Sequence, residues 1–360
     1  MVPEHLVGFG RKGRALRDVP SYCLGGFLAS KTLEPLLGSH ALVAAAALAG
    51  RADPATRVAR RATSVLDDKD VPQVLRQAAC LALGKVVHRE DRASLEALRR
   101  ECGEGRDPQT RSFATMALGE AGGDDNIAFL RRRLRSSKAR NDSLPWLALA
   151  LAVAATDSSE ALRASLRHDL FEAYEGVRAP EFSSGIAVAL GLLRATEAEE
   201  RIAERMLEIK SQSREAGYHA LALGLMRARG KTGDLRRLMD QSAARPEALV
   251  QSATGLALLG DKSVTHWLVD RLAKDSTSIE VRHGLTRALG LVGDKPALDS
   301  LLALARDDKA MALPRAFAVV ALGMIGDQDD LPWNASLASG VHYRASVGTL
   351  TGEVGVLDIL

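Results

Sequence analysis

The sequence is poor in aromatic side chains. Only 4% of its 360 residues are Phe, Trp or Tyr, although 46% are hydrophobic. A β-sheet core needs β-branched and aromatic residues at alternate positions, and no such run occurs before the far C-terminus. A core made of alanine, leucine and valine suits helices that pack closely. We therefore expect an all-α protein.

Cysteine is also scarce. The three examples, Cys23, Cys80 and Cys102, are too few and too scattered for a disulfide framework or a zinc site. Cys80 lies within an expected helix, where a thiol packs as a small hydrophobic group. We predict neither a metal nor a cofactor.

Charge and hydropathy exclude two further classes of protein. The 48 basic and 45 acidic residues nearly cancel, so no strong global field attracts nucleic acid. Residues 1–18 lack the apolar core of a secretory signal. The apolar run at residues 41–49 is far shorter than the ~20 residues that a membrane span needs. We expect no membrane span, a cytoplasmic location and no nucleic-acid partner.

What the sequence has in abundance is an internal repeat. Residues 282–294 contain an arginine, the triplet Ala-Leu-Gly and a final Gly-Asp, and residues 315–327 contain the same features at identical spacing. The step of about 33 residues is a solenoid period. Similar triplets, a leucine between two small residues, occur nine times. Their leucines are Leu48, Leu83, Leu118, Leu151, Leu190, Leu223, Leu256, Leu289 and Leu322.

The triplets predict a stack of helical hairpins, because alanine and glycine let two helix backbones approach closely. Each triplet marks an inner helix. Outer helices are expected between them in the second half of the chain, at residues 201–210, 234–240, 264–274 and 298–305.

The pattern Arg-x-x-Ala-x-x-Ala-Leu-Gly followed by Gly-Asp resembles the HEAT repeat, in particular the short bacterial variety called PBS-lyase HEAT-like. The resemblance covers residues from about 40 to 330. It implies a right-handed α-solenoid of about nine helical hairpins, an α-α superhelix of the armadillo/HEAT type. We expect an irregular segment at 1–35, the solenoid at 36–327 and an atypical cap at 328–360, since terminal repeats close the end of a stack.

A repeated arginine is the first candidate for a special role. It stands eight residues before the end of the triplet, as Arg76, Arg111, Arg282 and Arg315. Acidic residues precede it as Asp70, Asp275 and Asp308. We interpret these arginines as a structural ladder, in which each guanidinium bonds a carboxylate and loop carbonyls of a neighbouring repeat. An anion-binding stripe is the alternative.

Two segments are candidates for contact with a partner. The helix expected around residues 129–135 carries the densest basic cluster, formed by Arg131, Arg132, Arg133 and Arg135. Its alternative is a solvated outer face. Residues 137–200 include the longest step between triplets, with Phe171, Tyr174 and Phe182 in the connection. Inserted loops of a solenoid are often its contact surface, but these rings could instead fill a wider gap between repeats.

No catalytic constellation accompanies the repeat. HEAT proteins are mostly scaffolds and adaptors, so the resemblance implies a non-catalytic scaffold that binds a protein or peptide on its concave surface. A bilin-lyase-like enzyme and a nucleic-acid-binding HEAT-like protein stay open as alternatives. Deoxyhypusine hydroxylase shares this repeat and holds iron with His-Glu pairs. The chain contains no His-Glu dipeptide, which argues against that activity.

Overall fold

The computed structural model describes residues 34–49, 55–136, 143–156, 158–209, 214–274 and 278–326. All but two residues of the expected N-terminal segment 1–35, and the whole expected cap 328–360, lie outside them. The chain divides into two compact units, Met1–Ala117 and Leu118–Leu360. We call them unit 1 and unit 2.

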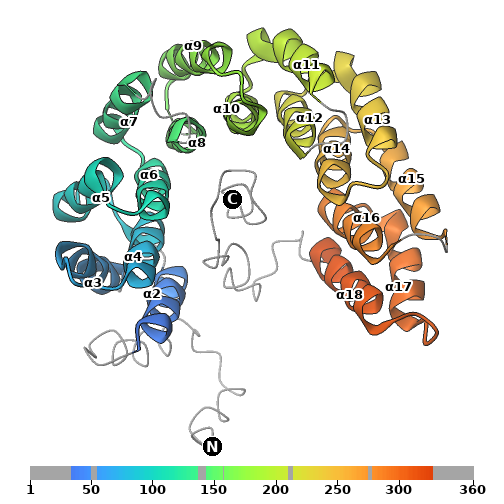
Figure 1. Cartoon of the computed structure of the whole chain (residues 1–360), viewed down its shortest axis with the longest axis horizontal. Helices are drawn as coiled ribbons and strands as arrows, with labels where there is room; N and C mark the ends of the chain where they lie inside the picture. The colour runs from blue at the N-terminus through green and yellow to red at the C-terminus, as the bar shows by residue number, and fades with distance from the viewer. Residues whose placement is uncertain are drawn as a thin grey trace, which may run out of the picture. The chain divides into compact units, whose positions relative to one another are not determined.

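Unit 1 is helical throughout its described part, apart from short turns. Its helices are α2 (Pro35–Ala49), α3 (Ala55–Asp67), α4 (Gln73–Val86), α5 (Arg92–Glu104) and most of α6 (Pro108–Ala121). Helix α2 packs on α4, and α3 packs on both α4 and α5. Figure 1 shows α2 and α4 in one row and α3 and α5 in another.

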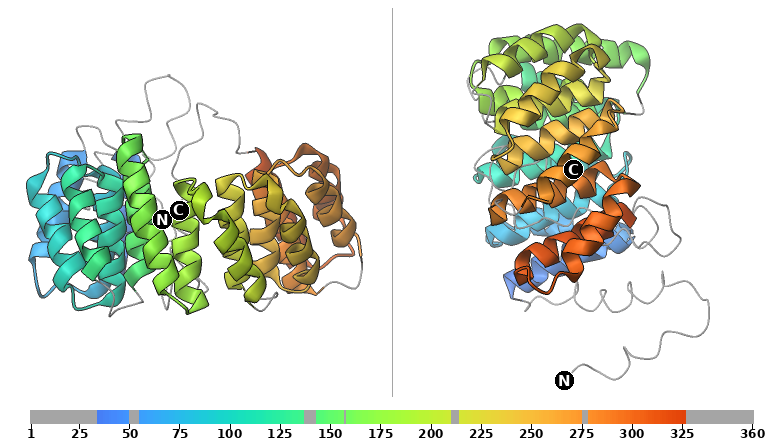
Figure 2. Two further views of the ribbon diagram at one scale, coloured as in Figure 1. Left: turned by 90° about the horizontal axis from the view of Figure 1, so that it is seen from above. Right: turned by 90° about the vertical axis from the view of Figure 1, so that its right-hand side faces the viewer.

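Unit 2 has the same kind of helix arrangement within itself. Its helices are α7 (Asp124–Ser136), α8 (Leu144–Ala154), α9 (Glu160–Gly176), α10 (Pro180–Leu192), α11 (Glu199–Glu208), α12 (Arg214–Met226), α13 (Thr232–Gln241), α14 (Pro246–Leu258), α15 (Ser263–Leu272), α16 (Ile279–Val292), α17 (Leu298–Arg306) and α18 (Ala312–Gly326). From α8 to α18, each even-numbered helix packs on the next even-numbered helix and on the odd-numbered helix before it. In Figure 2, right, these helices lie one over the next, with α18 last.

This packing is that of a HEAT-type α-solenoid, and it confirms the predicted fold class. The described residues form eight hairpins, from α3/α4 to α17/α18, together with α2. The expected count was about nine. Residues 1–33, which precede α2, are not described.

Sequence composition distinguishes the odd-numbered helices, which we call the odd row, from the even-numbered helices. Odd-numbered helices are amphipathic: α11 buries Ile202 and Met206 and exposes Glu200 and Glu204. Even-numbered helices are apolar on most sides, because they are covered by the odd row and by two even neighbours. In α8 every residue except Val153 is buried. Among the described helices, none is both long enough and apolar enough to cross a membrane.

The small residues of the triplets lie where even-numbered helices touch. A Cβ atom built on Gly224 would lie 2.6 Å from the Cα of Gly255, and one built on Gly191 would lie 2.8 Å from the carbonyl oxygen of Ala222. No side chain fits at such contacts. The leucines of these triplets, such as Leu223, are fully buried. The predicted role of the triplets in close helix packing is thereby observed.

Helices α10, α12, α14 and α16 of unit 2 end in a left-handed residue at one repeat position. These residues are Arg194, Arg227, Gly260 and Gly293, with φ values of 53°, 63°, 81° and 69°. In the first three, the next N–H donates to the leucine carbonyl of the triplet at 3.0 Å, which closes a Schellman motif. Glycine adopts this conformation without strain, whereas arginine rarely does.

Candidate functional site

Arg76, the first member of the predicted ladder, bonds two helices. Its Nη1 donates to the carbonyl oxygen of Asp68 at 2.6 Å, and its Nη2 donates to that of Leu66 at 3.0 Å and to the carboxylate of Glu101. The carbonyls belong to the end of α3, in the same hairpin as Arg76. The carboxylate belongs to α5 in the next hairpin, and it is Glu101, not the Asp70 that the sequence indicated.

The other ladder arginines bond within their own hairpins where contacts are described. Arg111 Nη1 donates to the carbonyl oxygen of Gly105 at 2.8 Å. Arg315 Nε donates to that of Ala305 at 3.2 Å, and its Nη2 lies 3.6 Å from Asp308 Oδ1. Arg282 is half-buried in α16, and Asp275 lies outside the described residues. Guanidinium groups at helix C-termini stabilise the last carbonyls, so these bonds favour a structural ladder over an anion-binding stripe.

Half of the basic cluster on α7 is engaged by a buried carboxylate. Arg131 Nε and Arg135 Nη2 bond the two oxygens of Asp169 in α9, whose side chain is 5% exposed. Burial alone would raise the pKa of this carboxyl, but the hydrogen bonds from both arginines bring it below its ordinary value. Arg132 is exposed and Arg133 is half-buried. The cluster therefore helps to join α7 to α9.

Tyr174, one of the three predicted contact rings, cannot serve a partner because it is fully buried. The guanidinium of Arg205 lies 4.2 Å from its ring centroid, and Arg205 Nη1 donates to the carbonyl oxygens of Tyr174 and Val177 at 2.9 Å. Phe171 and Phe182 are half-buried. Tyr174 thus fills space among α9, α11 and α12. This agrees with the alternative interpretation, in which the ring fills a gap between repeats.

His219 of α12 lies beside Tyr174, with ring centroids 6.0 Å apart. Its Nδ1 bonds the carbonyl oxygen of Glu215 at 2.8 Å, and its buried Nε2 has no hydrogen-bond partner in the described part of the chain. Burial lowers the pKa of His219 to about 4. The imidazole is therefore neutral near pH 7 and belongs to the core.

A row of apolar residues, some of them exposed, follows the triplets of α10 to α18. We call Leu192, Leu225, Leu258, Leu291 and Met324 the leucine row; each stands directly after a triplet and one repeat from the next. Leu192, Leu258 and Leu291 are 42%, 45% and 41% exposed. Leu225 and Met324 are half-buried. Sequence reasoning missed this row, although its regular spacing is visible in the sequence.

Two side chains of the row, Leu225 and Met324, have a packing role. Cβ atoms built on Gly191 and Gly290 would lie 3.1 Å from the Cβ of Leu225 and 2.9 Å from the Sδ of Met324, so these two row residues cover the triplet of the preceding repeat. The remainder faces water. Packing explains the covered part of these side chains, but it does not require the exposed part to be apolar.

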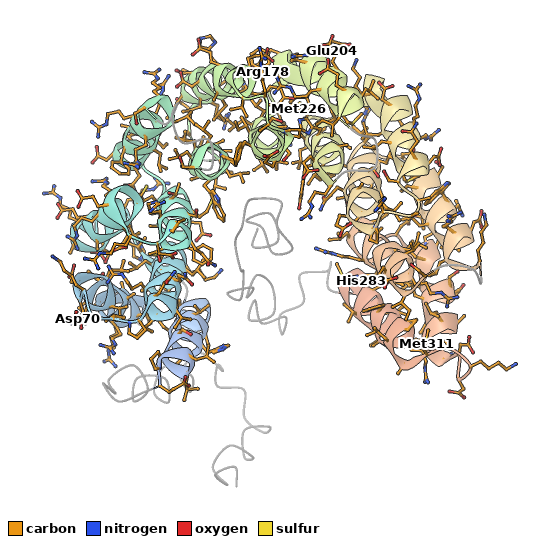
Figure 3. All side chains as sticks on the ribbon, viewed as in Figure 1. Asp70, Arg178, Glu204, Met226, His283 and Met311 are labelled. Atoms are coloured by element: carbon orange, nitrogen blue, oxygen red, sulfur yellow. The ribbon has the colours of Figure 1, made fainter. Side chains whose placement is uncertain are left out.

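The leucine row belongs to one face of the even-numbered helices. On α16 the residues open to solvent are Glu280, His283, Arg287 and Leu291, at intervals of three and four residues that define one helix face. Figure 3 shows His283 on the side of α16 turned away from the odd row. Its ring lies 4.5 Å from that of Phe317 in α18.

The opposite edge of this face is more acidic. Glu181, Glu247 and Glu280 occupy the first turns of α10, α14 and α16 at one repeat position, where α12 has Arg214. Carboxylates are favourable at helix N-termini, which accounts for them without a partner. The face nevertheless combines an apolar edge with a largely acidic one.

Two hollows lie among the described residues. One of about 610 Å³ in unit 1 is lined by Arg76, Glu101 and Asp107, and one of about 820 Å³ in unit 2 by Arg178, Arg205 and Glu215. Both are open and mix charges of both signs. Among the described residues, no group of three His, Cys, Asp or Glu side chains is placed to hold a metal ion.

Comparison with known proteins gives a distant structural likeness. No protein-family model matches the sequence, and no curated protein matches it. A solved structure of human deoxyhypusine hydroxylase in complex with glycerol is similar at 16% identity, over 76% of this chain and 98% of that chain, with a TM-score of 0.35. The assignment of the fold rests on the helix packing described above.

Proposed function

We propose that the protein is a non-catalytic scaffold that binds a protein or peptide through the leucine row of unit 2. One observation carries the proposal: Leu192, Leu258 and Leu291 are exposed at the same position of different repeats. Lys85 occupies this position in α4 and Glu120 occupies it in α6, so the repeat itself does not demand a hydrophobic residue there. Ordered apolar surface on a solenoid is typical of a partner-binding face.

The row indicates the chemistry of the partner. Neighbouring helix axes lie about 8–10 Å apart, so the row offers one apolar contact at about that interval. A bound helix presents side chains i and i+7 about 10 Å apart, because each residue rises 1.5 Å. We propose an amphipathic helical segment whose apolar face meets the row and whose basic residues lie near Glu247 and Glu280.

The alternatives gain no support from the described residues. A nucleic-acid-binding role needs free basic groups in a continuous groove, whereas Arg131 and Arg135 bond Asp169. A bilin-lyase-like role has no chromophore-handling residue assigned to it. The predicted cytoplasmic location belongs to the proposal and awaits its own test.

A comparative affinity purification tests the proposal. Tagged wild-type protein and the double variant Leu258→Glu/Leu291→Glu are each recovered from the native cells, and co-purifying proteins are quantified by mass spectrometry. A matched control is Leu207→Glu, which places the same charge at a 49% exposed leucine of α11 in the odd row.

We expect a partner that co-purifies equally with wild type and the control, and at least tenfold less with the double variant. Equal recovery of every co-purifying protein with all three would overturn the proposal. Circular dichroism and thermal unfolding of the variants establish that the fold is intact.

A further inference from the structure

Helix α18 exposes a face that its counterparts in unit 2 bury. Val319 is 58% exposed. The residues at the same repeat position of the four preceding even-numbered helices, Ala187, Ala220, Ala253 and Thr286, are at most 1% exposed. Each of those four helices has the next even-numbered helix packed against it. No described residue follows α18 to do the same.

The glycine of the α18 triplet shows the same difference. A Cβ atom built on Gly290 would lie 3.2 Å from the Cα of Ala321 in the next even-numbered helix. A Cβ atom on Gly323 would meet nothing within 4 Å. The last described helix thus has an apolar residue, Val319, and a small residue, Gly323, at stacking positions that no other described residue covers.

The sequence that follows α18 has the length and the spacing of one more repeat. Residues 327–360 are about one period long. They contain an arginine, a glycine eight positions later and another glycine three positions further, as Arg344, Gly352 and Gly355. The same spacing relates Arg315, Gly323 and Gly326 in α18, and Arg282, Gly290 and Gly293 in α16. The match departs inside the triplet, where Leu350 and Thr351 replace the alanine and leucine.

We propose that residues 328–360 of the same chain dock on the exposed face of α18 and cover Val319 and Gly323. Because this segment follows α18 directly, its effective concentration at that face exceeds that of a separate molecule. Its apolar residues, among them Leu350, Val354 and Leu357, suit an apolar surface. Docking would also close the stack, which terminal repeats of solenoids do to keep their cores from water and from other copies. The proposal is independent of the leucine row.

Hydrogen exchange measured by mass spectrometry on the full chain tests this docking. The wild type is compared with Val319→Glu, Gly323→Ala and the odd-row control Leu207→Glu. We expect amides of residues 340–357 to exchange at least tenfold more slowly than an unstructured chain in the wild type and the control. We expect this protection to fall at least tenfold in both α18 variants.

Gly323→Ala keeps the test decisive if the glutamate variant unfolds. Alanine is more favourable than glycine within a helix, so on an uncovered α18 it strengthens the helix and leaves residues 340–357 unchanged. If residues 328–360 cover α18, the methyl group of the new alanine pushes the segment away from the helix and lowers the protection of residues 340–357. Slow exchange in α12 and α14 shows in each variant that the rest of unit 2 is folded.

Three results would overturn the proposal. The first is rapid exchange of residues 340–357 in the wild type. The second is protection of this segment that neither α18 variant reduces. The third is a dimer in light scattering that Val319→Glu dissociates, because a second copy would then be the occupant of α18.

Discussion

Gly224 of α12 and Gly255 of α14 approach so closely that a Cβ atom on Gly224 would lie 2.6 Å from the Cα of Gly255. We predict that Gly224→Ala destabilises the protein by about 1–3 kcal/mol, because overpacking exceeds the gain in helix propensity. Urea unfolding followed by circular dichroism measures the change.

A matched glycine without such a contact is Gly233 in α13, where an added Cβ meets nothing within 4 Å. We expect Gly233→Ala to leave stability unchanged or to raise it by up to about 1 kcal/mol. If both alanine variants had the same stability as the wild type, the close approach of α12 and α14 would be wrong.

Replacing a left-handed arginine by glycine should stabilise the protein, whereas Gly224→Ala should destabilise it. Arg227 has φ 63° at a position where Gly260 has φ 81° one repeat later. Removal of the Cβ relieves the strain of this conformation, so we expect Arg227→Gly to stabilise the protein by about 0.5–1 kcal/mol. The control is Arg237→Gly, on an exposed position of α13, which should destabilise by a similar amount because glycine weakens a helix. Loss of stability in Arg227→Gly would contradict the assigned conformation.

Buried His219 makes stability depend on pH. Burial lowers the pKa of His219 from its ordinary value of 6.5 to about 4 in the folded protein. As the pH falls, the unfolded chain therefore takes up a proton at this residue before the folded protein does. The free energy of unfolding should therefore fall between pH 6.5 and 4, by up to about 3 kcal/mol from this residue. The measurement is urea unfolding at a series of pH values.

The variant His219→Leu should lose that part of the pH dependence, while His266→Leu, at an exposed position of α15, should keep it. Asp261 cannot produce the same signal. Hydrogen bonds from Arg236 hold the pKa of its carboxyl at about 2, so its contribution is lost only as the pH falls below about 4. An unchanged profile in His219→Leu would refute the burial of a neutral imidazole.

The contact between α7 and α9 depends on Asp169. Asp169→Asn leaves the guanidiniums of Arg131 and Arg135 without their carboxylate, and we expect a loss of about 1–3 kcal/mol. Arg135→Ala should cost under about 1 kcal/mol, because the arginine side chain is 62% exposed. Equal effects of the two substitutions, measured by urea unfolding, would argue against a buried acceptor at Asp169.

The helical repeat could be predicted from the sequence because its signal is local and periodic. The outer helix expected at 234–240 lies within α13 (Thr232–Gln241), and the one at 298–305 lies within α17 (Leu298–Arg306). Leu190, Leu223 and Leu289 occupy the buried position expected for the triplets, whereas Leu322 of α18 is half-buried. Helix period and small-residue contacts suffice for this part of the structure.

Solvent exposure and ion pairing could not be predicted in the same way. Tyr174 stands in a long connection with other aromatic residues, but its burial depends on Arg205 and His219 from two other helices. The partner of Arg76 is Glu101, which lies 25 residues further along the chain on another helix, whereas the sequence pattern associates Arg76 with the nearby Asp70. Leucines such as Leu258 have the sequence signature of core residues, and only the packing of neighbouring helices shows that they face water.

Site-specific photo-cross-linking at the leucine row tests the central claim most directly. A benzophenone amino acid replaces Leu258 or Leu291 on the row, or Leu207 on the odd row, and the protein is irradiated in its native cells. We predict that one partner cross-links from both row positions and not from position 207, through peptides with apolar residues at helical spacing. Cross-links of equal yield and identity from all three positions, or none from the row, would contradict the account.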